Sequence, residues 1–126
     1  LIDVIVSDHI PEDEESKRLP FAQAATGSIG IETLLSLSLE LYHNESLPLE
    51  KIIKCLTINP AKILKINKGT LKEGSEADIC IFDLEKPWVV KAENLKSKSK
   101  NTAIENRKLQ GKVKMTLLKG EIAYSN

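Results

Sequence analysis

The sequence has few cysteines and histidines, and neither type is spaced as in a metal or disulfide site. Cys55 and Cys80 lie singly in apolar runs without a CxxC pattern, which predicts reduced core residues rather than a disulfide scaffold or zinc knuckle. The two histidines, His9 and His43, form no His-x-His pair. Because a zinc site needs three or four protein ligands, we expect that this chain cannot build one from its own residues.

The chain also has no excess of charge and no long apolar run. Lys plus Arg and Asp plus Glu number 18 each, so the net charge is zero and no overall field attracts nucleic acid or acidic membranes. The Lys-rich stretch 91–108 contains Glu93 and Glu105 but no interleaved aromatics, which favours a solvated loop. No apolar run approaches the ~20 residues that span a bilayer, and no signal-peptide pattern opens the chain. We therefore expect a cytoplasmic protein with a small-molecule or protein partner.

The length is short for the fold that the opening residues suggest. A complete eight-stranded barrel needs roughly 250 residues, whereas this chain has 126 and begins with Leu1 rather than methionine. We expect a fragment of a longer protein.

The most informative segment is the opening one, where an apolar run leads into an acidic residue. Val4, Ile5 and Val6 are apolar and β-branched without alternation, as in a parallel strand buried on both faces. Pro11 prevents the strand from continuing, so Asp8 falls at its carboxyl end. Catalytic groups of (β/α) barrels collect at that end. A turn or helix cap is an equally good interpretation of Asp8 from this context alone.

The two histidines have different expected roles. Neighbouring residues of a strand point in opposite directions, so His9 and Asp8 are not expected to bind the same metal. We expect His9 to support the loop through hydrogen bonds. His43 lies at a helix end beside Asn44, which indicates a solvated or capping side chain.

The rest of the chain changes from helical to strand patterns near Gly69. A loop of about twenty residues precedes a leucine-rich helix over residues 31–42, capped by Ser28 and Asn44. A second helix starts at Pro48, and a short third one has Asn59 as its N-cap. Strands are predicted at 79–82, 88–90 and 111–118, and a hairpin turn at 118–121 leads into 122–124.

Several motifs resemble those of dihydroorotases. They are Ser7-Asp8-His9-Ile10-Pro11, Lys17-Arg18-Leu19-Pro20-Phe21 and Thr26-Gly27-Ser28-Ile29-Gly30-Ile31-Glu32-Thr33. The segments Asn59-Pro60-Ala61, Gly69-Thr70-Leu71 and Ala77-Asp78-Ile79 resemble amidohydrolases in general. The resemblance implies an α/β fold: residues 1–66 would supply the last strand and closing helices of a (β/α)₈ metallo-dependent hydrolase barrel. Residues 67–126 would form the C-terminal part of a small β-sandwich.

The same resemblance implies a reaction and roles for five residues. The family catalyses the reversible, zinc-dependent cyclisation of N-carbamoyl-L-aspartate to dihydroorotate in pyrimidine biosynthesis, with one or two zinc ions whose ligands here would lie mostly outside the chain. Asp8 matches the catalytic aspartate that binds metal and moves a proton. Thr26 and Gly27 match the loop that touches the substrate ring through its backbone, although phenylalanine is common at position 26. Glu12 replaces the histidine that usually binds the substrate carboxylate, and Arg18 is the alternative for that role because two carboxylates repel.

Other interpretations stay open at this point. Dihydropyrimidinases (hydantoinases) and allantoinases share the Asp-His-x-Pro feature. A non-catalytic dihydroorotase-like subunit that partners aspartate carbamoyltransferase is also compatible with the departure at Glu12. A self-sufficient binding module is disfavoured, because an unpaired apolar strand at residues 4–6 invites aggregation. As a dihydroorotase portion, the chain is expected to need the missing N-terminal barrel portion, to be inert alone, and to belong to a homo-oligomer.

Overall fold

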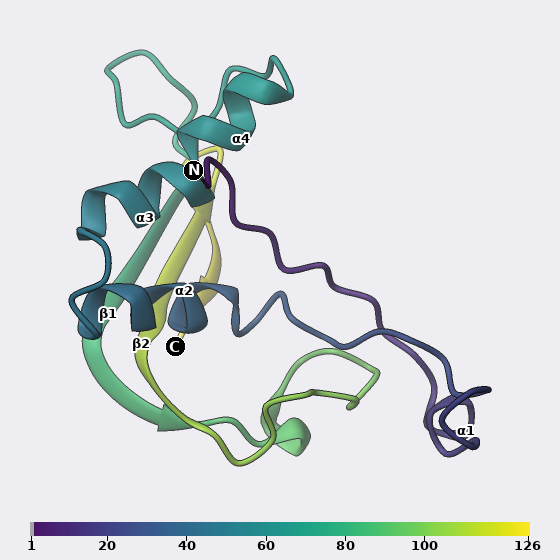
Figure 1. Cartoon of the computed structure of the whole chain (residues 1–126). Coiled ribbons are helices and arrows are strands. Elements are labelled where there is room, and N and C mark those ends of the chain that lie inside the picture. Colours follow the sequence, from purple (N-terminus) through teal and green to yellow (C-terminus); the bar gives the residue numbers. More distant parts are fainter. Residues whose placement is uncertain (1) are drawn as a thin grey trace.

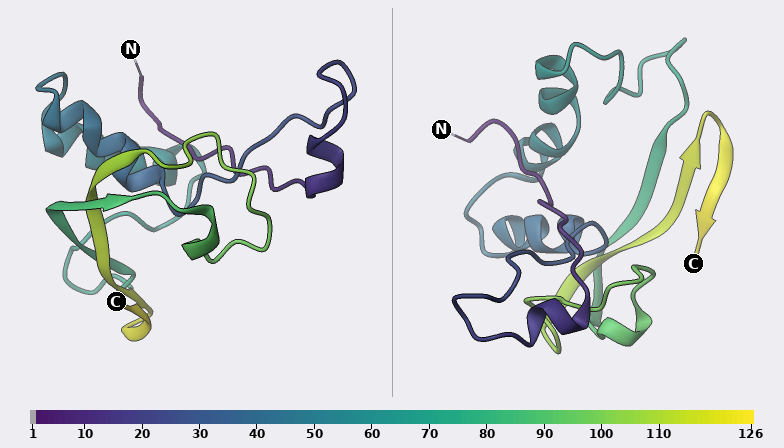
Figure 2. Two further views of the ribbon diagram at one scale, coloured as in Figure 1. Left: turned by 90° about the horizontal axis from the view of Figure 1, so that it is seen from below. Right: turned by 90° about the vertical axis from the view of Figure 1, so that its right-hand side faces the viewer.

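The helices of this chain precede its sheet. The computed structural model describes residues 2–126, and Leu1 lies outside the described residues. The elements in order are α1 (Glu14–Lys17), α2 (Leu34–His43), α3 (Leu49–Leu56), α4 (Ile58–Ile63), β1 (Ile79–Val89), the 3₁₀ turn η1 (Ala92–Asn94), β2 (Lys108–Leu118) and β3 (Glu121–Ser125). Figures 1 and 2 show α2 and α3 beside the sheet, and α1 at the end of an arm that extends away from it. None of the helices in residues 2–126 is long and apolar enough to cross a membrane.

The sheet is antiparallel, with strand order β1-β2-β3. The predicted hairpin is confirmed: Lys119 and Gly120 both have positive φ (52° and 86°), as a two-residue turn of type I′ requires. The two short strands predicted before it form one strand, β1, whose pairing with β2 shifts register between Asp83 and Pro87. Asp83 Oδ1 accepts hydrogen bonds from the backbone N–H groups of Glu85 at 3.1 Å and Lys86 at 3.2 Å. The predicted proline turn is therefore a bulge inside one strand.

The helical part and the sheet share one core. Ile29, Val90, Leu95 and Leu109 form a buried cluster, and α2 packs against β2. Ser36 Oγ of α2 donates a hydrogen bond of 2.6 Å to the carbonyl of Gly111 in β2. Residues before and after position 67 are thus held together by packing and by buried hydrogen bonds.

The predicted helices form, but two of their caps are wrong. Asn44 is the C-cap of α2 as predicted, and Pro48 directly precedes α3. The N-cap of α2 is Thr33, because the Ser28 hydroxyl instead bonds to the carbonyl of Asn101 at 3.2 Å. Asn59 lies inside α4, and its Nδ2 donates to the carbonyl of Asp3 at 2.8 Å. The side chains of Ser28 and Asn59, which were both expected to cap helices, are therefore hydrogen-bonded to distant segments of the chain instead.

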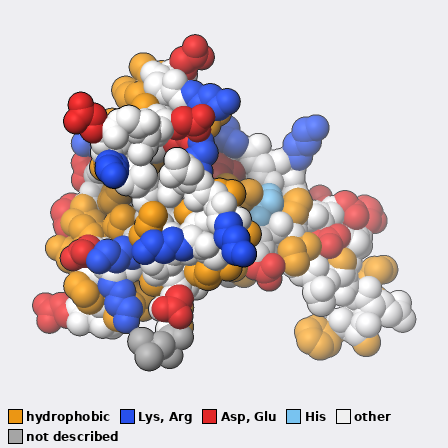
Figure 3. All heavy atoms as spheres, turned by 90° about the horizontal axis from the view of Figure 1, so that it is seen from above, with side chains coloured by type: hydrophobic (Ala, Val, Ile, Leu, Met, Phe, Trp, Pro, Cys, Tyr) orange, Lys and Arg blue, Asp and Glu red, His pale blue; other side chains and the backbone are white. Residues whose placement is uncertain are grey.

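The strand predicted at residues 4–6 does not form in this structure. The segment is extended, and its backbone contacts include Ile5 N–H to the carbonyl of Cys55 at 3.1 Å. A parallel ladder needs a neighbouring strand, and no other strand forms before Ile79 in the described residues. Val6 is 70% exposed and Phe21 fully exposed. Figure 3 shows hydrophobic side chains across the surface seen from above.

Two further expectations are wrong. Cys55 is buried as predicted, but Cys80 is exposed on β1, so it is not a core residue. His43 is the last residue of α2, and its Nε2 is buried with no hydrogen-bond partner among residues 2–126. The His43 side chain is therefore not solvated at that atom.

Candidate active site

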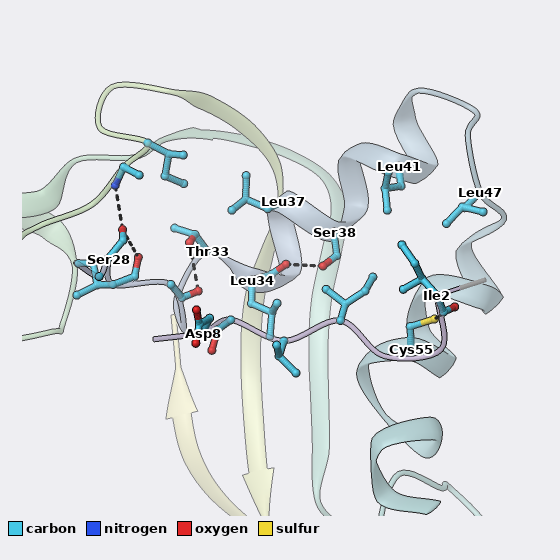
Figure 4. A pocket seen from close by; sticks show the side chains of 18 of the residues that line it. Ile2, Asp8, Ser28, Thr33, Leu34, Leu37, Ser38, Leu41, Leu47 and Cys55 are labelled. Carbon is cyan, nitrogen blue, oxygen red and sulfur yellow. Dashed lines mark hydrogen bonds between the residues drawn. The ribbon is translucent and has the colours of Figure 1, made fainter. Parts of the chain in front are cut away.

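Asp8 lies at one end of an apolar cavity of about 840 Å³. Leu34, Leu37 and Leu41 of α2 contribute to its wall, and Figure 4 shows Asp8 near Thr33 and Leu34, far from Cys55 at the opposite end. Asp8 is the only acidic residue among the described residues that line the cavity. Its backbone has φ of +43°, an uncommon value for a residue other than glycine, which marks a sharp change of direction after the extended segment.

His9 holds the loop beside Asp8. Its Nδ1 accepts hydrogen bonds from the backbone N–H of Gly30 at 3.1 Å and of Ile31 at 3.4 Å. The prediction that His9 supports the loop by hydrogen bonding is confirmed. Because Nδ1 accepts these hydrogen bonds, it is not available to a metal.

Gly27 lines the same cavity as Asp8. Its φ of +133° is rarely adopted by other residues, and a Cβ there would lie 2.7 Å from Ile10 Cγ2 and 2.8 Å from the Ile10 carbonyl oxygen. Ile10 in turn donates its backbone N–H to the carbonyl of Ser28 at 3.0 Å. The two arms of the loop are therefore in backbone contact at Gly27, which requires glycine there.

The other predicted substrate residues lie outside the cavity lining. Thr26 is exposed. Glu12 is fixed through its backbone, since its carbonyl accepts from Ser99 Oγ at 2.5 Å, and its carboxylate makes no hydrogen bond with another described residue. Arg18 is the C-cap of α1 and forms an exposed ion pair with Glu14. The structure thus brings together Asp8 and Gly27, but not Thr26, Glu12 or Arg18.

The short helix α1 gives the loop between these two arms a defined shape. Asp13 is its N-cap and accepts a hydrogen bond of 2.8 Å from the backbone N–H of Ser16. That hydrogen bond holds the pKa of Asp13 below its ordinary value. The cap fixes where this helix begins.

The chain can supply one metal ligand from this site. The Asp8 carboxylate is exposed and has no hydrogen bond or ion pair with another residue of the described chain, and carboxylate oxygen is a normal zinc ligand. No group of three or more His, Cys, Asp or Glu side chains in residues 2–126 is arranged to hold a metal. Asp8 fits a metal site only if the other ligands come from outside this chain.

The fold of the chain matches segments of longer solved structures. It superposes on a dihydropyrimidinase from Brevibacillus agri NCHU1002 with a TM-score of 0.92 at 24% identity, over 98% of this chain and 28% of that one. The inactive dihydroorotase-like domain of a Chaetomium thermophilum CAD-like multifunctional protein gives a TM-score of 0.60 at 18% identity, over 75% and 25%. At these identities the likeness shows the fold alone.

Sequence comparison gives the family. The model of the amidohydrolase family matches residues 1–123, and the chain belongs to this family. It is 45% identical to a dihydroorotase of Ehrlichia chaffeensis (strain ATCC CRL-10679 / Arkansas) over 98% of its own length. The chain spans 28% of the length of that relative.

Proposed function

We propose that this chain is the C-terminal portion of a dihydroorotase, which interconverts N-carbamoyl-L-aspartate and dihydroorotate. The observation that carries the proposal is the 45% identity to a dihydroorotase. The matched stretch covers 124 of the 126 residues, so it includes the Asp8 and Gly27 segments. Asp8 and Gly27 are also the two predicted site residues that line one cavity.

Asp8 has two roles in this proposal. It is one protein ligand of a zinc site whose remaining ligands lie outside this chain. When bound, zinc activates water and polarises the carbonyl that is attacked. During ring opening, the Asp8 carboxylate accepts the proton of the attacking water and gives it to the amide nitrogen that leaves. In ring closure it carries the proton in the opposite direction.

The loop from Glu12 to Gly27 would bind the substrate. The backbone at Thr26 and Gly27 would contact the substrate ring. The substrate carboxylate needs a positive partner, which Glu12 does not supply because like charges repel. Arg18 can take that role if it leaves its exposed ion pair with Glu14, and such pairs cost little to break.

The exposed apolar surfaces support a larger assembly. In the whole protein, residues 4–6 would become the last strand of a (β/α)₈ barrel that includes residues 1–66, and residues 67–126 would join a β-sandwich. This arrangement would cover Val6, which is 70% exposed in the isolated chain. The two free cysteines agree with a cytoplasmic location, where thiols stay reduced.

The test uses the full-length protein that contains this chain. It is assayed with N-carbamoyl-L-aspartate, dihydrouracil and allantoin, and the 126-residue chain alone is the control. We expect turnover of the first compound only by the full-length protein, and no turnover by the chain alone. Turnover of dihydrouracil or allantoin without turnover of N-carbamoyl-L-aspartate would refute the proposal.

A second candidate function rests on Glu12. A carboxylate in place of the usual histidine would weaken substrate binding, as in a non-catalytic dihydroorotase-like subunit that partners aspartate carbamoyltransferase. Metal analysis of the gently purified full-length protein separates the two functions. Zinc-free protein without turnover favours the non-catalytic subunit, whereas bound zinc with turnover favours the enzyme.

A further inference from the structure

The carbonyl of Gly27 is held from two sides by residues that sequence reasoning did not assign to the site. Lys17 Nζ donates to it at 3.1 Å and also to the carbonyl of Ala25 at 2.7 Å. Asn101 Nδ2 donates to the same Gly27 carbonyl at 3.2 Å. One donor therefore comes from the loop itself, and the other comes from a segment that lies 74 residues further along the chain.

Asn101 also reaches the other arm of the loop. Its Oδ1 accepts the backbone N–H of Glu12 at 3.4 Å, and its backbone carbonyl accepts the N–H of Ile29 at 3.1 Å. Ser99 assists, since its hydroxyl lies within hydrogen-bond distance of both Asn101 Oδ1 and the carbonyl of Glu12 and can donate its one proton to either. A single side chain thus joins the two ends of the loop at residues 12 and 27.

The chemistry of this contact requires an amide at position 101. Nδ2 must donate while Oδ1 accepts, and a carboxylate of the same shape can only accept. An aspartate would face the Gly27 carbonyl with negative charge and would leave that contact without its donor. On the other side, the Lys17 ammonium makes charge-assisted hydrogen bonds, which are stronger than those between neutral groups.

The position of Gly27 gives these contacts a role in binding. Glycine has more backbone freedom than any other residue, so its peptide group stays in one orientation only if other groups hold it. Gly27 lines the cavity that contains Asp8. Fixing the Gly27 carbonyl also fixes the peptide groups on either side of it relative to Asp8.

We propose that Lys17 and Asn101 are positioning residues that hold the Gly27 backbone in the orientation that binds the substrate ring. This inference rests on the proposed dihydroorotase function. It gives the second half of the chain a part in substrate binding through Asn101. Neither Lys17 nor Asn101 is among the residues that line the cavity containing Asp8.

The experiment uses Lys17→Met, Lys17→Arg and Asn101→Asp in the full-length protein. The matched control is Lys98→Met, because Lys98 is exposed and its ammonium makes no hydrogen bond or ion pair with another described residue. KM and kcat for dihydroorotate are measured at fixed zinc concentration. Hydrogen exchange of the backbone amides of Ile10 and Ile29 is followed on the same samples.

We expect Lys17→Met to raise KM about tenfold, the factor that a lost hydrogen bond to a charged group typically represents. Asn101→Asp should also raise KM, because it leaves the Gly27 carbonyl without a donor and places a negative charge beside it. Turnover at saturation should stay within about twofold, because a contact made equally in the ground and transition states changes KM alone. Lys17→Arg should restore most of the affinity, since its guanidinium can also donate to two carbonyls. The control should match the wild type.

The outcomes separate this inference from the proposed function. If the wild type turns over dihydroorotate but neither Lys17→Met nor Asn101→Asp raises KM, the inference is overturned. A large fall in kcat with unchanged KM also overturns it. If the wild type has no activity on dihydroorotate, the proposed function fails, and the exchange data decide whether the contacts hold Gly27. Faster exchange at Ile10 and Ile29 in Asn101→Asp supports the contacts, and unchanged exchange refutes them.

Discussion

Replacing Gly111 with alanine should destabilise the core where α2 meets the sheet. Gly111 has φ of +91°, and a Cβ there would lie 2.4 Å from Leu39 Cδ1. Leu39 is completely buried, so its side chain has little room to move away. The Gly111 carbonyl also accepts hydrogen bonds from Ser36 Oγ at 2.6 Å and from Trp88 Nε1 at 3.1 Å. A backbone shift that relieves the collision would therefore strain these two bonds.

Gly74 provides a matched control for the magnitude. Its φ of +84° is close to that of Gly111, but nothing lies within 4 Å of its Cβ position. At either position, alanine in a left-handed backbone conformation costs about 1–2 kcal/mol of folding free energy. Only Gly111→Ala adds the cost of overpacking, about 1–3 kcal/mol. We expect the free energy of unfolding to fall by that additional amount in Gly111→Ala relative to Gly74→Ala.

The assay is a urea titration of the full-length protein that contains this chain, followed by circular dichroism. Leu39→Val removes the δ-methyl groups, so it should recover stability when combined with Gly111→Ala. The double-mutant cycle should then show a favourable coupling of about 1 kcal/mol, as for residues in direct contact. The collision would be refuted if Gly111→Ala and Gly74→Ala lowered the free energy of unfolding equally and if the effects of Leu39→Val and Gly111→Ala were additive.

Two further predictions concern pH and thiol chemistry. The Lys68 ammonium and the backbone N–H of Lys119 hold the pKa of Asp78 in the folded protein below its ordinary value of 3.8. The Asp78 carboxylate therefore stabilises the fold above pH 3.8, and this contribution is lost as the pH falls through the lower pKa of the folded state. Urea midpoints of the wild type and Asp78→Asn should differ above pH 3.8 and converge below it, and a constant difference would contradict the ion pair. In the native chain, a thiol reagent should modify the exposed Cys80 but not the buried Cys55. The reaction of Cys80 should be slow, because partial burial of its thiol raises its pKa and so lowers the fraction of reactive thiolate. Mass spectrometry counts the modified thiols, and rapid labelling of Cys55 without denaturant would contradict the packing.

Features with local signals could be predicted from the sequence. The turn at Lys119 and Gly120 follows from its position between two apolar runs, and helix α3 follows from Pro48 and the spacing of its apolar residues. The supporting role of His9 followed from the alternation of side chains along an extended segment. Each of these signals lies within a few residues of the feature that it predicts.

Features that depend on distant partners could not be predicted. Asn101 belongs to a stretch whose composition indicated a solvated loop, and its bonds reach residues 12 and 27. Ser28 and Asn59 are good cap residues whose side chains bond to other segments instead. The segment at residues 4–6 has a strand sequence, but strand formation requires a neighbour that the described chain does not provide.

The kinetics of Asp8→Asn in the full-length protein test the central claim most directly. Asparagine keeps the size of the side chain but can neither accept the proton in the same way nor supply the charge of a metal ligand. Asp13→Asn is the matched control, because asparagine also serves as an N-cap for α1. We predict that Asp8→Asn lowers kcat for dihydroorotate by about 10²- to 10⁴-fold and that Asp13→Asn does not. Turnover by Asp8→Asn equal to that of Asp13→Asn would contradict the assignment of Asp8 as ligand and proton carrier.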